Sequence, residues 1–281
     1  MHSPQATRTE RKVLDTLATL PHISEFFVNY IRPPLTPSIP LDKLRNGHLQ
    51  SLVINGSFRV AAPEDNFLES LSDLLFNNPR LAHLELILDD LAQPFHFSDL
   101  FKRPSPSILR LRTLILSGWL LECTPEVTAH LQSLQRLELH SGVIVEPEVW
   151  AMFKKHQVSL RHLHTCQLNE ELLDYLDSFS TLETLSFNHQ LAPGPGTEES
   201  RSISRRFFER VLVRHTESLQ TLRVQPFPDA SEWGVGLWNV EFFKAFRRLE
   251  VLEIAPSMLE DHPASESRRL MVRFLETIPT T

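Results

Sequence analysis

One spacing of apolar residues recurs along the chain. An apolar residue is followed by two free positions, a second apolar residue, one free position and a third apolar residue, as in Leu134, Leu137 and Leu139. Clear copies of this pattern begin at Leu49, Leu81, Leu111, Leu134, Leu182, Leu219 and Leu249. Weaker copies begin at Ile23 and at Leu160, and in the latter Thr165 stands in the third apolar position. The sequence therefore contains nine related segments.

The spacing has a direct structural meaning. The last two apolar positions are two residues apart, so in an extended segment both point to one side while their neighbours point to the other. A single short strand cannot bury that side alone, but stacked copies form a continuous core and a parallel sheet. Because successive copies begin 22 to 37 residues apart, each strand has room for a return segment. The pattern predicts an α/β fold, a leucine-rich-repeat solenoid with the sheet on its concave face and helices and loops on its convex face.

The return segments contain helix signals. Residues 63–78 combine Glu64 and Asp65 with apolar residues at helical spacing, which predicts a helix. Further helices are predicted to begin at Pro125, Pro147 and Asn169, to cover residues 201–215 and to follow Asn239. Residues 95–106, rich in phenylalanine and proline, are expected to form turns.

The same pattern divides the chain into three parts. Residues 1–22 are expected to be a polar tail and a capping helix, residues 23–259 the solenoid of about nine irregular repeats, and residues 260–281 either a closing helix or a truncation point of a longer array. Residues 31–40 (IRPPLTPSIP) contain four prolines. Their P-x-x-P spacing leaves open an SH3-ligand interpretation beside that of a rigid repeat loop.

Composition narrows the classes of function. A net charge of −7 and a pI near 6.0 argue against non-specific nucleic-acid binding, which needs a basic surface. The two cysteines, Cys123 and Cys166, provide no disulfide framework, as is typical of a reducing compartment. The sequence also lacks a secretory signal and any run of ~20 apolar residues. We therefore expect a soluble cytoplasmic or nuclear protein that binds neither nucleic acid nor membranes.

Motifs of catalysis are missing from the sequence. It has no glycine-rich phosphate loop, no G-x-S-x-G, no H-E-x-x-H and no Cys-x-x-Cys pair. The sequence thus predicts a protein that is not an enzyme and needs no cofactor.

The free positions of the strands predict a mixed surface that faces away from the core. Val53, Ile87 and Ile115 form an apolar band between polar residues, which suits a protein partner better than a small molecule. Trp233, in a separate glycine-containing loop, is predicted either to anchor a partner or to pack over the core. The predicted partner-binding residues are Val53, Glu85, Ile87, Ile115, Ser117, Arg136, Glu138, His140, His164, Asn188, Arg223 and Trp233.

One group of outward residues also suggests metal chemistry. Aligning two neighbouring copies places Glu138 beside His164 and His140 beside Cys166, on strands ~4.8 Å apart. These side chains are all potential zinc ligands, although a flat array suits the tetrahedral preference of zinc poorly. A polar protein-binding patch and an ordinary exposed sheet are the alternatives.

Phrases such as LRTLILSG and LQRLELHSG, in repeats of uneven length, resemble the repeat region of fungal F-box/leucine-rich-repeat proteins. The similarity covers residues ~20–255 as a repeat pattern. The resemblance implies a role in substrate recognition within a ubiquitin ligase, which the protein would join through an adaptor protein. Two features depart from the family. The Asn or Cys usual at the ninth repeat position is replaced by Ser57, Asp89, Trp119, Gly142 and Gln190, and no F-box is evident before the first strand.

Three hypotheses follow from the sequence. The favoured one is a non-enzymatic scaffold that holds an unknown protein partner on the concave face. The second is a substrate-recognition component of an SCF-type ubiquitin ligase that lacks a recognisable F-box. The third is a metal-binding protein centred on Glu138, His140, His164 and Cys166.

Overall fold

A computed structural model describes residues 16, 23–30, 41, 47–57, 65–89, 93–102, 107–188, 197–225, 231–235 and 239–254. The chain divides into two compact units, and each is described by itself. Unit 1 comprises residues 1–152 and 156–158, and unit 2 comprises residues 153–155 and 159–281. Several predictions concern segments outside the described residues: the tail and capping helix of residues 1–22 apart from Thr16, the proline-rich residues 31–40, and the closing segment 260–281.

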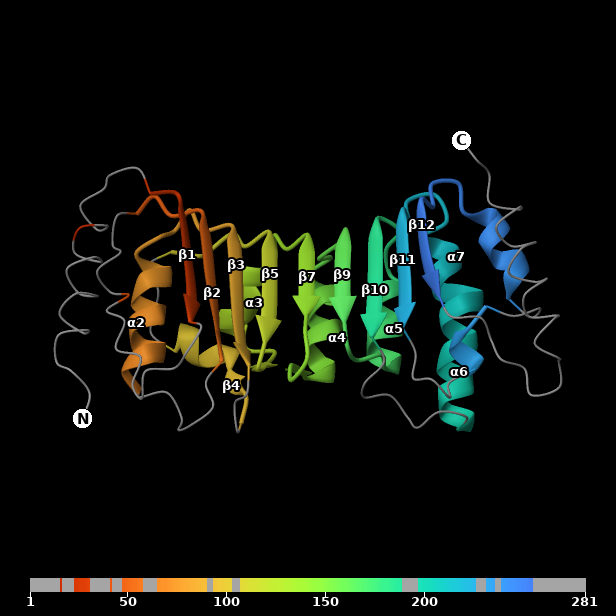
Figure 1. The fold of residues 1–281 in the computed structure, drawn as a ribbon, viewed down its shortest axis with the longest axis horizontal. Coiled ribbons are helices and arrows are strands. Elements are labelled where there is room, and N and C mark those ends of the chain that lie inside the picture. The colour runs from red at the N-terminus through yellow and green to blue at the C-terminus, as the bar shows by residue number, and fades with distance from the viewer. Residues whose placement is uncertain are drawn as a thin grey trace. The chain divides into compact units, whose positions relative to one another are not determined.

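Nine parallel strands stand at the nine predicted positions (Figure 1). In unit 1 the order is β1 (Glu25–Tyr30), β2 (Ser51–Ser57), β3 (His83–Asp89), β5 (Thr113–Ser117) and β7 (Arg136–Leu139). In unit 2 it is β9 (His162–Thr165), β10 (Thr184–Asn188), β11 (Thr221–Gln225) and β12 (Val251–Ile254). The predicted α/β class with a parallel sheet is therefore confirmed.

The apolar repeat sets the register of the strands. In unit 1, Leu52, Leu84, Leu114 and Leu137 pair directly across neighbouring strands, and each is 0% exposed. In the degenerate copy, Thr165 takes the inward position and is 1% exposed. Its Oγ1 accepts a hydrogen bond from the backbone N–H of Gln167 at 3.1 Å, so the hydroxyl has a partner inside the core.

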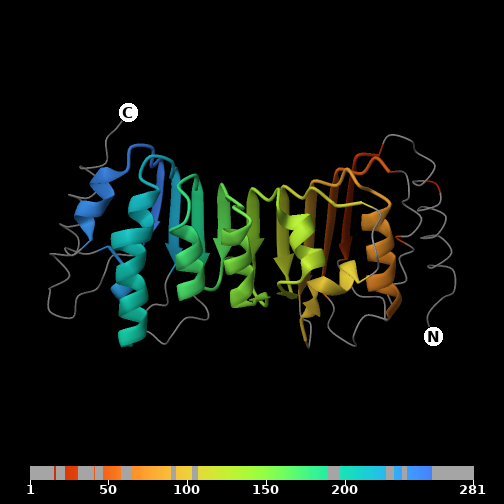
Figure 2. The same ribbon diagram turned by 180° about the vertical axis from the view of Figure 1, so that it is seen from behind.

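The helices lie on one face of the strands in each unit, as the two opposite views show (Figures 1 and 2). The predicted helices are present as α2 (Asp65–Phe76), α3 (Pro125–Leu131), α4 (Pro147–Lys155) and α5 (Glu170–Leu176). The predicted cap of α5 is confirmed, because Asn169 Oδ1 accepts from the N–H of Leu172 at 2.9 Å. Thr124 caps α3 in the same way, with Val127 N–H as donor at 3.3 Å.

The helix predicted over residues 201–215 is longer and less regular than expected. It consists of α6 (Glu198–Arg206), a π-helical turn η3 (Phe207–Val211) and α7 (Leu212–Arg214). The side chains of Phe207, Phe208 and Val211 are each 0% exposed. Single π turns of this kind are rare and occur mostly as insertions in α-helices.

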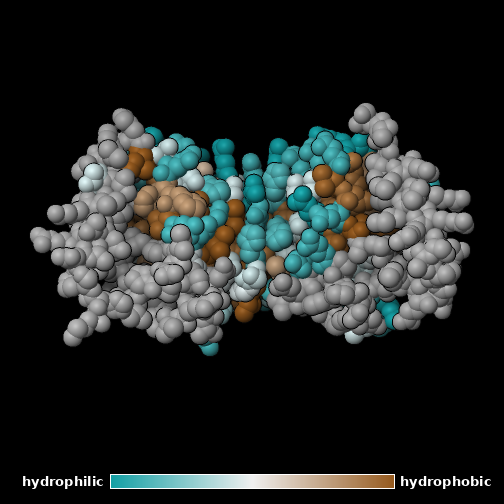
Figure 3. Space-filling model, viewed as in Figure 1, coloured by the Kyte–Doolittle hydropathy of each residue, from teal (hydrophilic) through white to brown (hydrophobic). Residues whose placement is uncertain are grey.

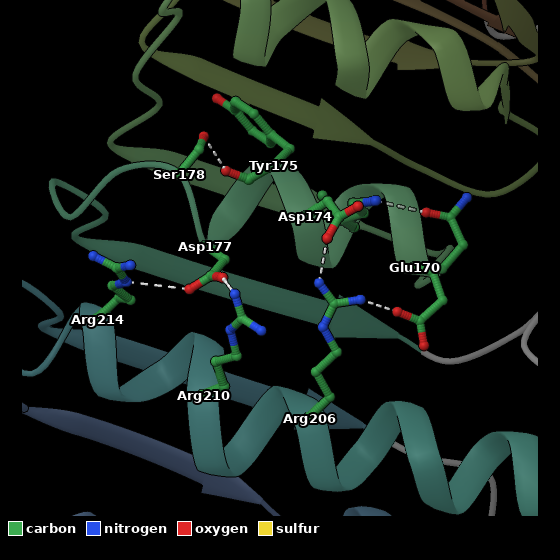
Figure 4. Close-up of polar contacts among 10 residues, drawn as sticks. Glu170, Asp174, Tyr175, Asp177, Ser178, Arg206, Arg210 and Arg214 are labelled. Carbon is green, nitrogen blue, oxygen red and sulfur yellow. Dashed lines mark hydrogen bonds and ion pairs between the residues drawn. The ribbon is translucent and has the colours of Figure 1, made fainter.

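A ladder of ion pairs joins this long helix to α5 (Figure 4). Arg206 pairs with Glu170 and Asp174, whereas Arg210 and Arg214 both pair with Asp177, at 2.5 and 3.1 Å. Burial alone would raise the pKa of Asp177, but the hydrogen bonds from the two arginines outweigh it and lower that pKa.

The expectation of turns was wrong for residues 95–101, and residues 103–106 lie outside the described part of the chain. Phe95–His96 form a short strand, β4, and Phe97–Phe101 form a 3-10 helix, η2. β4 pairs with β6 (Trp119–Leu121), which pairs with β8 (Ile144–Val145), so unit 1 has a second, three-stranded parallel sheet. Burial explains why this segment forms regular structure rather than turns. Phe97 and Phe101 are 0% and 2% exposed, and Phe97 packs edge-on against Trp119.

The segment after Asn239 also differs from its prediction. It forms a 3-10 helix, η5 (Val240–Ala245), and the Asn239 side chain makes no cap. Asn239 is 0% exposed and its Nδ2 donates instead to the carbonyl of Gly234 at 3.0 Å. The amide therefore stabilises the preceding loop, which contains the 3-10 turn η4 (Ser231–Trp233).

Candidate functional site

The strand face without described helices is called the open face of each unit. In unit 1 its side chains form rows across the strands, and the middle row consists of Phe27, Val53, Glu85, Ile115 and Glu138. Apolar and polar side chains lie next to one another on the side of the molecule seen in Figure 3. The predicted mixture of outward residues is thus present on the strands.

Of the eight predicted partner-binding residues in unit 1, six are exposed or partly exposed and two are buried. Arg136 is exposed, and Glu138 and His140 are partly exposed. Val53, Glu85 and Ile87 are partly accessible outward residues. Ile115 points outward but is only 7% exposed, and Ser117 is 1% exposed, so the prediction of both as contact residues was wrong. Neighbouring strands hold Glu85 and Glu138 beside Ile115.

The burial of Ser117 has a separate cause. Its Oγ donates to the carbonyl of Ser141 at 2.8 Å, in the turn after the next strand. Gly118 and Gly142 follow these serines with φ angles of 79° and 78°. Glycine adopts such angles without steric cost, so the backbone can turn sharply after each of the two serines.

Glu138 is the most strongly perturbed carboxylate on the open face of unit 1. Arg136 Nη2 lies 2.5 Å and His140 Nε2 lies 3.5 Å from its oxygens. Hydrogen bonds from His140 and then Arg136 lower the pKa of Glu138 to about 2, although burial acts in the opposite direction. Glu138 is therefore ionised at physiological pH, and its charge is largely compensated inside the protein.

The predicted residues of unit 2 lie on an open face where polar side chains of neighbouring strands contact one another. His164 Nδ1 is 3.1 Å from Ser186 Oγ, and Asn188 is partly exposed at the end of β10. Arg223 pairs with Glu253 on the neighbouring strand at 3.0 Å. This face thus pairs cation with anion directly across its strands.

Trp233 is a core residue, which corrects its prediction as a partner-binding residue and agrees with the alternative of packing over the core. Its side chain is 0% exposed and packs edge-on against Phe187, with ring centroids 5.3 Å apart. Its Nε1 donates to Ser200 Oγ at 3.2 Å. The aromatic ring fills the core, while its polar atom has a hydrogen-bond acceptor.

The metal interpretation lacks geometric support. Among the described residues, no three His, Cys, Asp or Glu side chains form a group that could hold a metal ion. Cys166 is 7% exposed, and burial raises the pKa of its thiol, which disfavours the thiolate that binds zinc. We therefore do not propose a metal site at Glu138, His140, His164 and Cys166.

Phe27 was missing from the predicted binding residues. It lies outward on β1 and is 61% exposed, the largest value among the exposed large apolar side chains of the described part of the chain. Its sequence signal is an aromatic residue at the outward position of the first copy. That strand ends the described strand order of unit 1, so β2 is its neighbour there.

No model of a known protein family matches the sequence, and no curated protein matches it either. In the portion of the chain that the structure describes, every helix is too short or too polar to cross a membrane.

Proposed function

We propose that the chain is a leucine-rich-repeat solenoid and acts as a non-enzymatic scaffold that binds a protein partner on the open face of unit 1. Repetition of the strand, helix and register supports the solenoid. Exposed outward side chains support the binding role. As part of this proposal the protein works in the cytoplasm or nucleus, since Cys123 and Cys166 are both free thiols.

The exposure of Phe27 is the observation that carries the proposed function. A phenylalanine that is 61% exposed leaves a large apolar area in contact with water. The partly exposed Val53 pairs with it on the neighbouring strand, so the two extend one apolar area. Apolar contacts with polar groups around them are typical of protein interfaces.

The alternative role in a ubiquitin ligase stays a prediction. It requires a segment that binds an adaptor protein, and residues 1–22 lie outside the described part of the chain except for Thr16.

Affinity purification with matched variants tests the proposal. We would compare the tagged wild-type protein with the double variant Phe27→Ser and Val53→Ser, both in cells that naturally make it. The matched control is Ile108→Ser with Val213→Ser, which removes apolar side chains that are 60% and 47% exposed and that lie outside the strands. The proposal predicts a partner that the control retains and the open-face variant loses. A partner set that is identical for all three proteins would contradict it.

A further inference from the structure

The middle row of unit 1 contains a carboxylate between apolar neighbours. Glu85 pairs across the strands with Val53 on one side and with Ile115 on the other. Its side chain is 19% exposed, so part of its charge is removed from water. Burying a carboxylate is costly unless a donor or a cation compensates it.

The compensation inside the protein is weak at this position. Glu85 Oε2 lies 3.8 Å from Nε2 of His83, which is charged only when protonated. With its amide oriented to satisfy both of its polar atoms, Asn55 donates to Glu85 Oε1 at 3.2 Å. By contrast, the other carboxylate of the row, Glu138, has the guanidinium of Arg136 at 2.5 Å. Among the described residues of the row, Glu85 is therefore the carboxylate whose charge is less well compensated.

The open face of unit 2 provides an internal comparison. There Arg223 lies 3.0 Å from Glu253. Elsewhere in unit 2, Arg161, which precedes β9, lies 3.1 Å from Glu183, which precedes β10. Both charges of each pair are already matched. Among the described residues, Glu85 thus differs from these pairs, because its compensation is weak and it lies two strands from the exposed Phe27.

We propose that the partner segment bound by unit 1 is basic as well as apolar, with an apolar side chain on Phe27 and Val53 and a Lys or Arg side chain on Glu85. This inference rests on the proposed function of the open face. Phe27 and Glu85 are two strands apart, which corresponds to about 10 Å. Three residues of a peptide in the polyproline II conformation cover about the same distance, and its three residues per turn place side chains three positions apart on the same side. A segment with an apolar residue and a basic residue three positions apart fits the row, and the aliphatic part of the basic side chain contacts Val53, the partly exposed apolar neighbour of Glu85.

A peptide array provides the probe. Each peptide has Leu or Phe followed three positions later by Arg, within a Gly/Ser background, and matched peptides have Gln or Glu in place of Arg. The wild-type protein is expected to bind the Arg set above the Gln set and the Gln set above the Glu set. Equal binding of the three sets, or no binding to any, overturns the inference.

Charge exchange then tests Glu85 itself, by fluorescence anisotropy with the best Arg peptide and its Glu counterpart. We expect Glu85→Gln to weaken the Arg peptide by about tenfold, and Glu85→Lys to weaken it further while improving the Glu peptide. Glu253→Gln, on the open face of unit 2, serves as the control and is expected to leave both affinities unchanged. Unchanged affinity in the Glu85 variants overturns the inference.

The same titration separates this inference from the proposed function. If Phe27→Ser abolishes binding while the Glu85 variants bind normally, the open face is the binding surface but the basic partner is wrong. If neither Phe27→Ser nor the Glu85 variants alter the binding of any peptide, the peptides bind elsewhere and both the inference and the proposed function are contradicted.

Discussion

The two faces of the same strands are under different physical constraints. Leu52 and Val53 are consecutive residues of β2, yet Leu52 is 0% exposed beneath the helices and Val53 is partly exposed on the open face. Inward positions repeat the same apolar residue from strand to strand, because each must fill one layer of a shared core. Outward positions change from Phe27 to Val53 to Glu85. The inward face therefore determines the fold, whereas the residues of the outward face are free to vary.

The largest expected effect separates the two faces at adjacent residues. Leu52→Ala removes a fully buried side chain and leaves a cavity, so we expect a loss of about 2–5 kcal/mol in the free energy of unfolding. Val53→Ala, on the opposite face, is expected to cost less than about 1 kcal/mol. Urea denaturation of both variants measures the difference, and equal losses would contradict the assignment of faces.

Acid should lower the stability of the folded protein through His215, which is buried in unit 2. This histidine is 0% exposed, and burial lowers its pKa from 6.5 to about 4, despite a hydrogen bond to the carbonyl of Leu176. Because its pKa is lower in the folded state, the unfolded chain binds the proton first. Stability that is complete above pH 6.5 is therefore lost as the pH falls towards 4, by about 3 kcal/mol.

The variant His215→Gln isolates this contribution, since glutamine retains a donor for the Leu176 carbonyl but does not titrate. Denaturation curves from pH 7 to 4 should show a steeper loss for the wild type than for the variant. Parallel losses would contradict the role assigned to His215; burial also lowers the pKa of His130, but that effect is common to both proteins.

A smaller loss of stability is expected when the cap at the start of α5 is removed. Asn169→Ala removes the acceptor for the N–H of Leu172, and loss of such a cap typically costs about 1 kcal/mol. Asn188→Ala, which alters the same residue type on the open face, should change stability by less than about 0.5 kcal/mol. Thermal unfolding of the two variants provides the comparison. A larger loss for Asn188→Ala would reverse the expected order of the faces.

The smallest stability effect should accompany the largest functional effect. Phe27→Ser is expected to change the free energy of unfolding by less than about 0.5 kcal/mol, because the ring is 61% exposed. The same variant should lose its partner. Circular dichroism melting, combined with the affinity purification, distinguishes this result from unfolding; a strongly destabilised variant would indicate that Phe27 is a packing residue.

Sequence reasoning succeeded where one local rule decides the structure. The spacing of apolar residues two positions apart predicted where the nine strands of the large sheet lie in the sequence. The pairing of Leu84 with Leu114 follows from aligning the copies. The start of α5 was equally predictable, because Asn169 precedes an apolar helical pattern.

It failed where burial depends on side chains distant in sequence. Ile115 stands at an outward position, but residues of two neighbouring strands flank it and leave it 7% exposed. Trp233 is covered by phenylalanines of β10 and the long helix, and no local signal reveals that contact. The second sheet was missed for a related reason, since strands of two or three residues are too short to show a period.

Hydroxyl-radical footprinting of the protein with and without its purified partner tests the central claim most directly. The labelling rate of Phe27 in unit 1 reports on the open face, and Ile108 and Val213 report on apolar side chains elsewhere that are 60% and 47% exposed. The proposal predicts that the partner protects Phe27 and leaves Ile108 and Val213 unchanged. Protection of Val213 with unchanged labelling of Phe27 would place the partner on the helical side and contradict the proposed binding surface.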